Sequence, residues 1–286
     1  MKTISLFVLL LLSVPAWTQQ TFTQKIGATD RVVVKFFKSE MMVEAHSGNE
    51  ILIEALNYKA PPERAKGLRP LYNSAMDNTN IGLQIEKIEG GYEIREASRQ
   101  DGKYLIKLPA TAKLSIWEMN WGGEDIKIKG MKSEIEVKSK NADVRLTDIT
   151  GPVIVNSTSG DIEIDFSSFS QAGPSSINAI SGDVDVTMPA SAKANYSLTS
   201  ISGEIYTDLD LKLGGEDGKS RKEAKEEAKE VQKRAALYYI QSRADGNSGA
   251  SINYSFVGHT IKATANGGGA SFTIRATSSD IYLRKK

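Results

Sequence analysis

The sequence predicts an all-β protein, a single-domain β-solenoid of short stacked strands with one charged helical insertion. The first observation is a phrase of Ser-Gly, an acidic residue and then alternating apolar and polar residues, found at 158–165, 180–187 and 201–208. A related phrase closes the chain at 278–283. The second observation is a fixed spacing between strand starts. The third is a turn phrase that occurs twice.

The strand starts recur with a period typical of stacked repeats. Successive starts are 18, 18, 22 and 21 residues apart, at Ile126, Val144, Ile162, Val184 and Ile205. A second series interleaves with the first, at Ile135, Val153, Ile177 and Leu198. Each repeat therefore holds two short strands, as in a solenoid. We expect one apolar column of Ile162, Val184, Ile205 and Ile281, with turns at positive φ at Gly160, Gly182 and Gly203.

The turn phrase Pro-Ala-x-Ala-Lys occurs at 109–113 and again at 189–193. A strand and a Gly-acid step follow each copy, which predicts two related β halves within one continuous domain. Strands at this spacing also occur in β-sandwiches, so a sandwich is the alternative fold.

Residues 1–18 read as a secretory signal peptide, because Lys2 precedes an apolar run from Ile4 to Leu12 that is short for a membrane span. The mature domain is then 19–286, with no transmembrane segment. Its charge is near neutral, since loss of Lys2 leaves 36 − 1 = 35 basic against 35 acidic residues, which disfavours nucleic acid as a partner. The chain has no cysteine, which excludes disulfides and a cysteine-linked lipid anchor. We expect an exported protein, periplasmic or at the cell surface.

Strands are expected within 22–56, and then the pattern breaks at 57–80, which holds Pro61, Pro62 and Pro70. This segment reads as a long loop or end cap. The alternative is a loop that binds an anion or a glycan, because a long irregular loop in a compact domain is often functional. The basic and aromatic residues that would serve it are Arg64, Arg69 and Tyr72.

Strands resume at 81–88, 91–96 and 103–108, and a charged segment interrupts the pattern at 214–246. Within it, 219–240 carries one helical stripe of small and apolar residues: Ala224, Ala228, Val231, Ala235 and Tyr238. This predicts a surface helix docked on the β core, or a docking element for a partner or second copy. Strands are expected again from 251 to the C-terminus.

Four acidic residues hold equivalent positions after the turns: Asp161, Asp183, Glu204 and Asp280. Stacked coils would place them about 4.8 Å apart, where carboxylates repel each other. They would then extend into water and pair with lysines, accept turn amides, or bind Ca²⁺.

The sequence predicts no enzyme and no cofactor. His46 and His259 are isolated, and nucleophile-elbow, P-loop and dinucleotide-binding patterns are absent from the sequence. The acidic residues recur at every coil, so no pair stands out for glycoside hydrolysis. Trp117 and Trp121 read as cap or core residues, or as a surface that grips carbohydrate.

The Ser-Gly-Asp-Ile repeats, the Asn-Gly-Gly-Gly turn at 266–269 and the terminal Asp-Ile-Tyr-Leu-Arg phrase resemble the exported, adhesin-like DUF4097-type proteins. The similarity covers about 30–286, and 62–72 looks like members from Bacteroidetes-type bacteria. The resemblance implies a β-solenoid closed by the terminal phrase, and it brings no catalytic residues with it. Ser279 stands where the family usually has glycine, so we expect a different geometry at that turn.

The leading hypothesis is therefore a non-enzymatic, adhesin-like binding or structural module of the cell envelope, with an envelope protein or a glycan as partner. One alternative is a carbohydrate-active enzyme on a β-helix, with acids converging in a cleft. Another is an envelope signalling or assembly partner that acts through 219–240.

Overall fold

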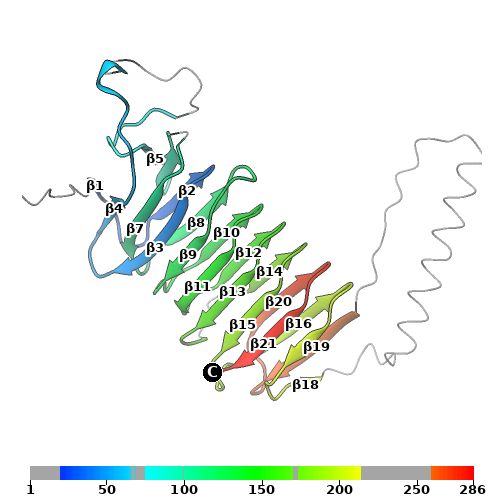
Figure 1. The fold of residues 1–286 in the computed structure, drawn as a ribbon. Coiled ribbons are helices and arrows are strands. Elements are labelled where there is room, and N and C mark those ends of the chain that lie inside the picture. Colours follow the sequence, from blue (N-terminus) through cyan, green and yellow to red (C-terminus); the bar gives the residue numbers. More distant parts are fainter. Residues whose placement is uncertain (1–19, 66–67, 69–74, 99, 170–172, 214–258) are drawn as a thin grey trace, which may run out of the picture.

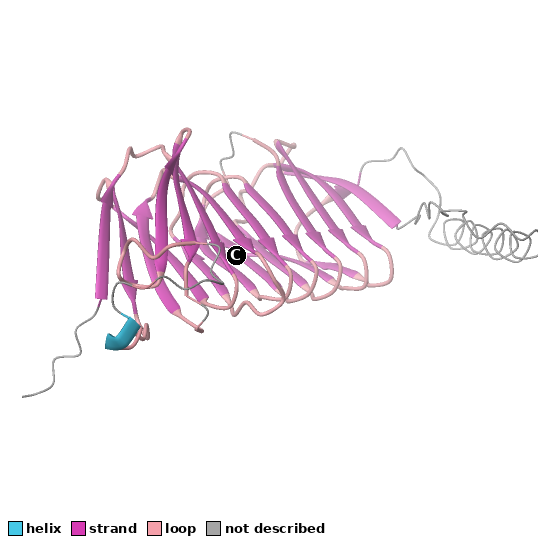
Figure 2. Ribbon diagram, turned by 90° about the horizontal axis from the view of Figure 1, so that it is seen from above, coloured by secondary structure: helices cyan, strands magenta, loops and turns pink. Residues whose placement is uncertain are grey.

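The computed structural model describes residues 20–65, 68, 75–98, 100–169, 173–213 and 259–286. The strands stack along one axis into an elongated body (Figure 1), and the view from above shows them running side by side down its length (Figure 2). They form two sheets, of ten and eleven strands. The all-β solenoid predicted from the sequence is confirmed, while residues 1–18 and 214–246 lie outside the described residues.

We call the ten-stranded sheet sheet A and the eleven-stranded one sheet B. In spatial order, sheet A holds β1 (Gln20–Lys25), β4 (Glu50–Ala55), β7 (Lys103–Pro109), β3 (Glu40–His46), β9 (Ile126–Lys129), β11 (Val144–Ile149), β13 (Ile162–Phe166), β15 (Val184–Met188), β21 (Ile281–Lys285) and β17 (Ile205–Thr207). Sheet B holds β18 (Lys212–Leu213), β19 (His259–Ala265), β16 (Ala194–Ser200), β20 (Ala270–Ala276), β14 (Ser175–Ala179), β12 (Val153–Ser157), β10 (Ile135–Ser139), β8 (Lys113–Glu118), β2 (Arg31–Phe36), β6 (Gly91–Glu96) and β5 (Leu83–Ile88).

The two-residue alternation of each strand creates the core. On β13, Ile162 and Ile164 are buried, while Glu163 between them is exposed. Parallel pairing places Ile162 between Val144 of β11 and Val184 of β15, so the apolar side chains line up from coil to coil. One strand alone could not bury this face, and the stack buries it continuously.

The coils do not stack in chain order. At one end, β2 and β3 lie between the coil of β6 and β7 and the coil of β8 and β9. At the other end, β20 and β21 lie between β14 and β15 on one side and β16 and β17 on the other. The predicted apolar column exists, but Ile281 pairs with both Val184 and Ile205 and so separates them.

Both Pro-Ala-x-Ala-Lys turns lie where the chain passes over an inserted coil. The turn after β7 leads to β8 and bypasses β2, and the turn after β15 leads to β16 and bypasses β20. Thr111 Oγ1 donates to the carbonyl of Ala28, just before β2. Asn266 Nδ2 donates to the carbonyls of Ala190 and Ala192, just before β20. The repeated phrase thus marks two equivalent crossovers, each held against the coil that fills its gap.

Glycine serves two purposes in the turns. Gly160 and Gly182 have positive φ, at 96° and 97°, as expected. The expectation is wrong at Gly203, which is not among the positive-φ residues. A Cβ at Gly203 would lie 2.0 Å from the carbonyl oxygen of Ser279, so this position needs glycine for close backbone approach. Ser279 also lacks a positive φ, and its buried Oγ has no hydrogen-bond partner.

Two buried glutamates connect neighbouring coils on sheet B. Glu118, 3% exposed at the end of β8, accepts the backbone amides of Lys140, Asn141 and Ala142 at 2.7, 2.8 and 3.2 Å. Glu96, 3% exposed at the end of β6, accepts the amide of Lys38 at 3.1 Å and the hydroxyl of Ser39. Each carboxylate therefore closes a turn on the adjacent coil. Neither glutamate stands out in the sequence, because each is a single acidic residue at a strand end.

The expected loop at 57–80 includes one short 3₁₀ helix, η1 (Glu63–Ala65). Near its end Asp77 accepts the amides of Thr79, Asn80 and Gly82, which fixes the approach to β5. Within the described ranges, no helix is long and apolar enough to cross a membrane.

A polar ladder as the candidate functional site

The outer face of sheet B carries a row of polar side chains, one from each of six neighbouring strands. Strand pairing aligns their Cα atoms in register across β10, β12, β14, β20, β16 and β19. We call these residues the polar ladder: Lys138, Asn156, Asn178, Arg275, Thr199 and Thr260. Outward positions of parallel strands repeat at about 4.8 Å, so the ladder is roughly 24 Å long over its five steps.

The ladder lines a groove of about 610 Å³. Residues that follow the strands form one side of it, among them Thr158, Ile180 and Thr277. Ile180 is 52% exposed and is the one apolar side chain of this rim with a large accessible area. The groove is therefore long and open, and most of its lining residues are polar, which suits an extended ligand that forms many hydrogen bonds.

Some ladder side chains already bond to one another. Asn178 Nδ2 donates to Asn156 Oδ1 at 2.9 Å, and the hydroxyls of Thr199 and Thr260 are 2.9 Å apart. Asn178 Nδ2 also donates to Ser176 Oγ at 3.4 Å, so the capacity that this amide keeps lies on its oxygen, while each hydroxyl can both donate and accept. The contacts hold the side chains in place without saturating them.

The cations of the ladder differ in their partners. Lys138 Nζ lies 2.8 Å from Glu136, two residues earlier on the same face. Burial tends to raise the pKa of Glu136, but hydrogen bonds from Lys138 and Ser115 hold this pKa below its ordinary value. Arg275 is exposed, and within the part of the chain that the structure describes it has no ion pair or hydrogen bond from its side chain.

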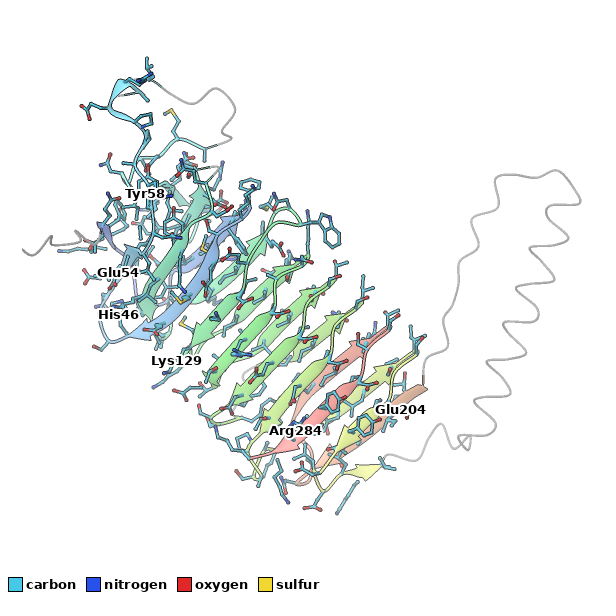
Figure 3. All side chains as sticks on the ribbon, in the orientation of Figure 1. His46, Glu54, Tyr58, Lys129, Glu204 and Arg284 are labelled. Carbon is cyan, nitrogen blue, oxygen red and sulfur yellow. The ribbon has the colours of Figure 1, made fainter. Side chains whose placement is uncertain are left out.

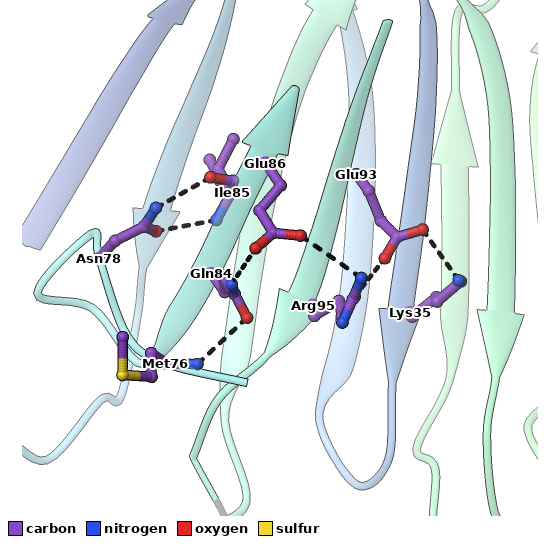
Figure 4. A network of polar contacts seen from close by, with 8 residues as sticks. All are labelled: Lys35, Met76, Asn78, Gln84, Ile85, Glu86, Glu93 and Arg95. Carbon is purple, nitrogen blue, oxygen red and sulfur yellow. Dashed lines mark hydrogen bonds and ion pairs between the residues drawn. The ribbon is translucent and has the colours of Figure 1, made fainter. Parts of the chain in front are cut away.

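Towards β5 the same row continues with cations that are fully paired. Figure 4 shows Arg95 between Glu86 and Glu93, with Lys35 on the other side of Glu93. Lys35 Nζ is 2.8 Å from Glu93. Burial tends to raise the pKa of Glu93, but Lys35 and Arg95 hold it below its ordinary value. This end of the sheet is an internal ion-pair network, in contrast to the region around Arg275.

Trp117 lies between the paired and the open parts of the row. Its strand, β8, has β2 and β10 as neighbours, and the ammonium groups of Lys35 and Lys138 lie 4.9 and 4.4 Å from its ring centroid. The two lysines approach from opposite sides, so the ring supports them by cation–π contact. Trp117 thus supports the lysine at the start of the ladder, and its predicted role in gripping carbohydrate stays a prediction.

The other binding residues expected from the sequence do not join this site. Arg64 is exposed in η1, which lies beyond β5 at the far end of the stack (Figure 1). Trp121 is 59% exposed in the turn between β8 and β9. Arg69 and Tyr72 lie outside the described residues. The structure does not bring Arg64 together with the two tryptophans.

The acidic turn residues form a hydrogen-bonded chain that runs along the stack. The amide of Asp161 donates to Asp143 Oδ1 at 2.8 Å, and the amide of Asp183 donates to Asp161 Oδ1 at 2.8 Å. The amides of Asp280 and Glu204 continue the series. Turn-amide capping is therefore the outcome for Asp161, Asp183 and Asp280, and each of these carboxylates caps the next coil of the stack. No cluster of three or more His, Asp or Glu among the described residues is arranged to hold a metal ion.

A second hollow, of about 260 Å³, lies beside these turns on sheet A. Its carboxylates have structural partners. Glu163 is 2.7 Å from Arg145 and Asp185 is 2.8 Å from Arg284. Figure 3 shows Arg284 on this face, close to the C-terminal end of the stack. The acids of this hollow hold coils together through amides and arginines.

Comparison with known proteins agrees with this architecture. The family model "Toastrack DUF4097" matches residues 79–237, more than half of the chain. The structure is an all-β stack with an exposed polar groove, and the chain belongs to the Toastrack DUF4097 family.

Two solved structures are similar over most of the chain. One is a candidate cell adhesion protein from Clostridium sporogenes, with 10% identity, a TM-score of 0.42 and coverage of 94% of this chain and 100% of the other. The second is a candidate adhesin from Bacteroides fragilis, with 11% identity, a TM-score of 0.39 and coverage of 95% and 99%.

Among curated proteins, the β subunits of DNA-directed RNA polymerase from Rickettsia canadensis and Rickettsia massiliae are 32% identical over 110 residues. The match covers 36% of this chain and only 8% of the length of these curated relatives.

Proposed function

We propose that this protein is a non-enzymatic, adhesin-like binding module of the cell envelope that holds an extended glycan along the polar ladder. The observation that carries the proposal is the groove of about 610 Å³ over six aligned polar side chains. Each new strand adds one hydrogen-bonding group, so the surface repeats at about 4.8 Å and can contact a linear ligand at many points. Individually weak contacts then add along the chain.

A glycan fits this surface better than a peptide. A peptide that binds by strand addition needs a free sheet edge. Five of the six ladder strands, β10, β12, β14, β20 and β16, have a neighbour on both sides, so these five offer no edge for strand addition. Most of the lining residues of the groove are polar, whereas the side chains that anchor a peptide favour apolar pockets. Amide and hydroxyl groups match the hydroxyls of a sugar, which also both donate and accept.

The predicted signal peptide supports an exported location, and membership of the Toastrack family is compatible with an adhesin-like role. The groove is open at the surface, so a long polymer can lie across it without threading. Acids converging in a cleft would favour the alternative of a carbohydrate-active enzyme. The acids of the smaller hollow bond to turn amides and arginines instead.

The proposal is tested by binding of the chain from residue 19 to a glycan array, with and without calcium. The ladder variant is Asn156→Ala combined with Asn178→Ala. The matched control is Thr147→Ala with Thr187→Ala, two half-buried polar residues on the outer face of sheet A. We expect the ladder variant to lose most of the binding and the control to keep it. Equal binding by both variants, or shortening of the bound glycan, would overturn the proposal.

A further inference from the structure

The position of Arg275 gives more detail about the ligand. It lies on β20, near the middle of the ladder, with Asn178 on one side and Thr199 on the other. The residues of its own strand on the same face are Thr273 and, just beyond the strand, Thr277. All four neighbours are neutral and polar. Among the described residues, the guanidinium therefore faces the groove without a counter-charge.

This contrasts with every other arginine in the described strands. Arg31 is paired with Glu136, Arg95 with Glu93, Arg145 with Glu163 and Arg284 with Asp185. Within the described strands, each outer-face arginine except the one in the groove is thus paired with a carboxylate. The row of residues beside the ladder on the same face is also free of acids here, since Ser176 and Ser197 flank Thr273.

We propose that Arg275 is the anion-recognition residue of the groove, and that the ligand is an acidic glycan with carboxylate groups along its chain. This inference rests on the proposed function. Guanidinium presents a planar fork that binds a carboxylate through two parallel hydrogen bonds. Asn178 and Thr199 are placed to bind the hydroxyls next to that carboxylate. Lys138, three strands away in the ladder, is already paired with Glu136, so among the described groove residues Arg275 is the cation left for a carboxylate of the ligand.

The inserted C-terminal coil is what places this charge in the groove. Without it, β14 and β16 would be neighbours, and the ladder would join Asn178 to Thr199 with no cation between them. The terminal coil thus completes the candidate site as well as the stack. A carboxylate-specific site is therefore a consequence of the strand order described above.

The test compares oligogalacturonate, which has a carboxylate on each sugar, with its methyl ester, which has the same chain without charge. Binding to the chain from residue 19 is measured by calorimetry. We expect oligogalacturonate to bind at least about tenfold more tightly than the ester, and its binding to weaken as salt rises. Arg275→Gln should weaken the binding of oligogalacturonate by about tenfold and so remove most of its advantage over the ester. Arg275→Lys should keep only part of that advantage, because a lysine lacks the planar fork of guanidinium.

The matched control is Arg145→Gln, which removes the same charge from the outer face of sheet A and should leave the affinity unchanged. A poly-glutamate peptide is included to distinguish a glycan from an acidic peptide. Equal affinity for the acid and its ester, with the loss in the Asn156/Asn178 variant retained, would overturn the charge inference while leaving the proposed function in place. Equal binding of poly-glutamate would overturn the choice of glycan. Absence of binding to every glycan would overturn both.

Discussion

The backbone amide of Asp183 donates a hydrogen bond to the carboxylate of Asp161 at 2.8 Å, although the two residues are one full coil apart. The same bond links Asp143 to Asp161 and Asp183 to Asp280. The acidic residue that recurs in the sequence thus forms a chain of hydrogen bonds from coil to coil, and this chain fixes the spacing of the turns. Hydrogen bonds to a charged acceptor are stronger than neutral ones, which offsets the repulsion between neighbouring carboxylates.

We predict that Asp161→Ala lowers the free energy of unfolding by about 1 kcal/mol, because it leaves the Asp183 amide without its protein partner at a site where water can replace it. Asp161→Asn should cost less, since the amide oxygen still accepts the bond and the repulsion is removed. Urea denaturation of the three proteins measures this order. A larger loss for asparagine than for alanine would contradict the proposed role of the acceptor oxygen.

Two glycines allow the cost of a left-handed backbone to be measured separately from the cost of a steric clash. Gly90 and Gly182 both have positive φ, but a Cβ at Gly90 would meet nothing within 4 Å, whereas one at Gly182 would lie 2.3 Å from the carbonyl oxygen of Gly160. Gly90→Ala should therefore cost only the conformational penalty of about 1–2 kcal/mol. Gly182→Ala should cost at least about 1–3 kcal/mol more, because two coils must move apart.

Thermal and urea unfolding of the two glycine variants give the comparison directly. Each variant serves as the control of the other, since both introduce the same methyl group at a left-handed position. Equal losses would show that the contact between Gly182 and Gly160 relaxes at little cost.

Much of the architecture follows from periodicity, because inward positions must be apolar for any coil to bury its face. The order of the coils does not follow, since Ile205 and Ile281 are equally suited to pair with Val184 and nothing local distinguishes them. The repeated Pro-Ala-x-Ala-Lys phrase marks both crossovers. However, the sequence does not show that another coil fills the gap at each crossover. Without that information, the repeated phrase indicates two β halves.

The spacing of the polar-ladder residues is also visible in the sequence. Lys138, Asn156 and Asn178 are 18 and 22 residues apart (156 − 138 and 178 − 156), the same intervals as the strand starts. Aromatic and basic residues such as Trp117 and Arg64 stand out more strongly as candidate binding residues. Ordinary polar residues at outward positions gave no signal on their own, and Arg275 enters the row only through the inserted coil.

Glu118 predicts an acid-sensitive component of stability. Burial tends to raise the pKa of this carboxyl, but the amides of Asn141, Lys140, Ala142 and Gly123 hold the pKa below its ordinary value of 4.5 in the folded protein. A folded-state pKa below the unfolded one gives stability that is present above the unfolded pKa and is lost as pH falls through the folded pKa. We therefore expect unfolding free energy to decline with acidification from about pH 5 downward.

Glu118→Gln should lower stability near neutral pH by about 2–3 kcal/mol, because the new amide group would face backbone donors in a buried site. It should also flatten the pH dependence. Glu134→Gln, at an exposed position one strand away, is the matched control and should change neither quantity. Urea titrations at several pH values measure both effects. An unchanged acid slope in Glu118→Gln would show that other carboxyls produce it.

The inserted coil makes a prediction that depends only on strand order. Ile281 is fully buried between Val184 and Ile205, while Ile205 is half-buried on the last strand of sheet A. Ile281→Ala should therefore cost about 2–5 kcal/mol, and Ile205→Ala clearly less, because an edge site loses fewer contacts and relaxes more easily. If the coils were stacked in chain order, Ile205 would be the interior residue and the ranking would reverse. Urea denaturation of the two variants thus decides whether the C-terminal coil lies inside the stack, where it also places Arg275 in the groove.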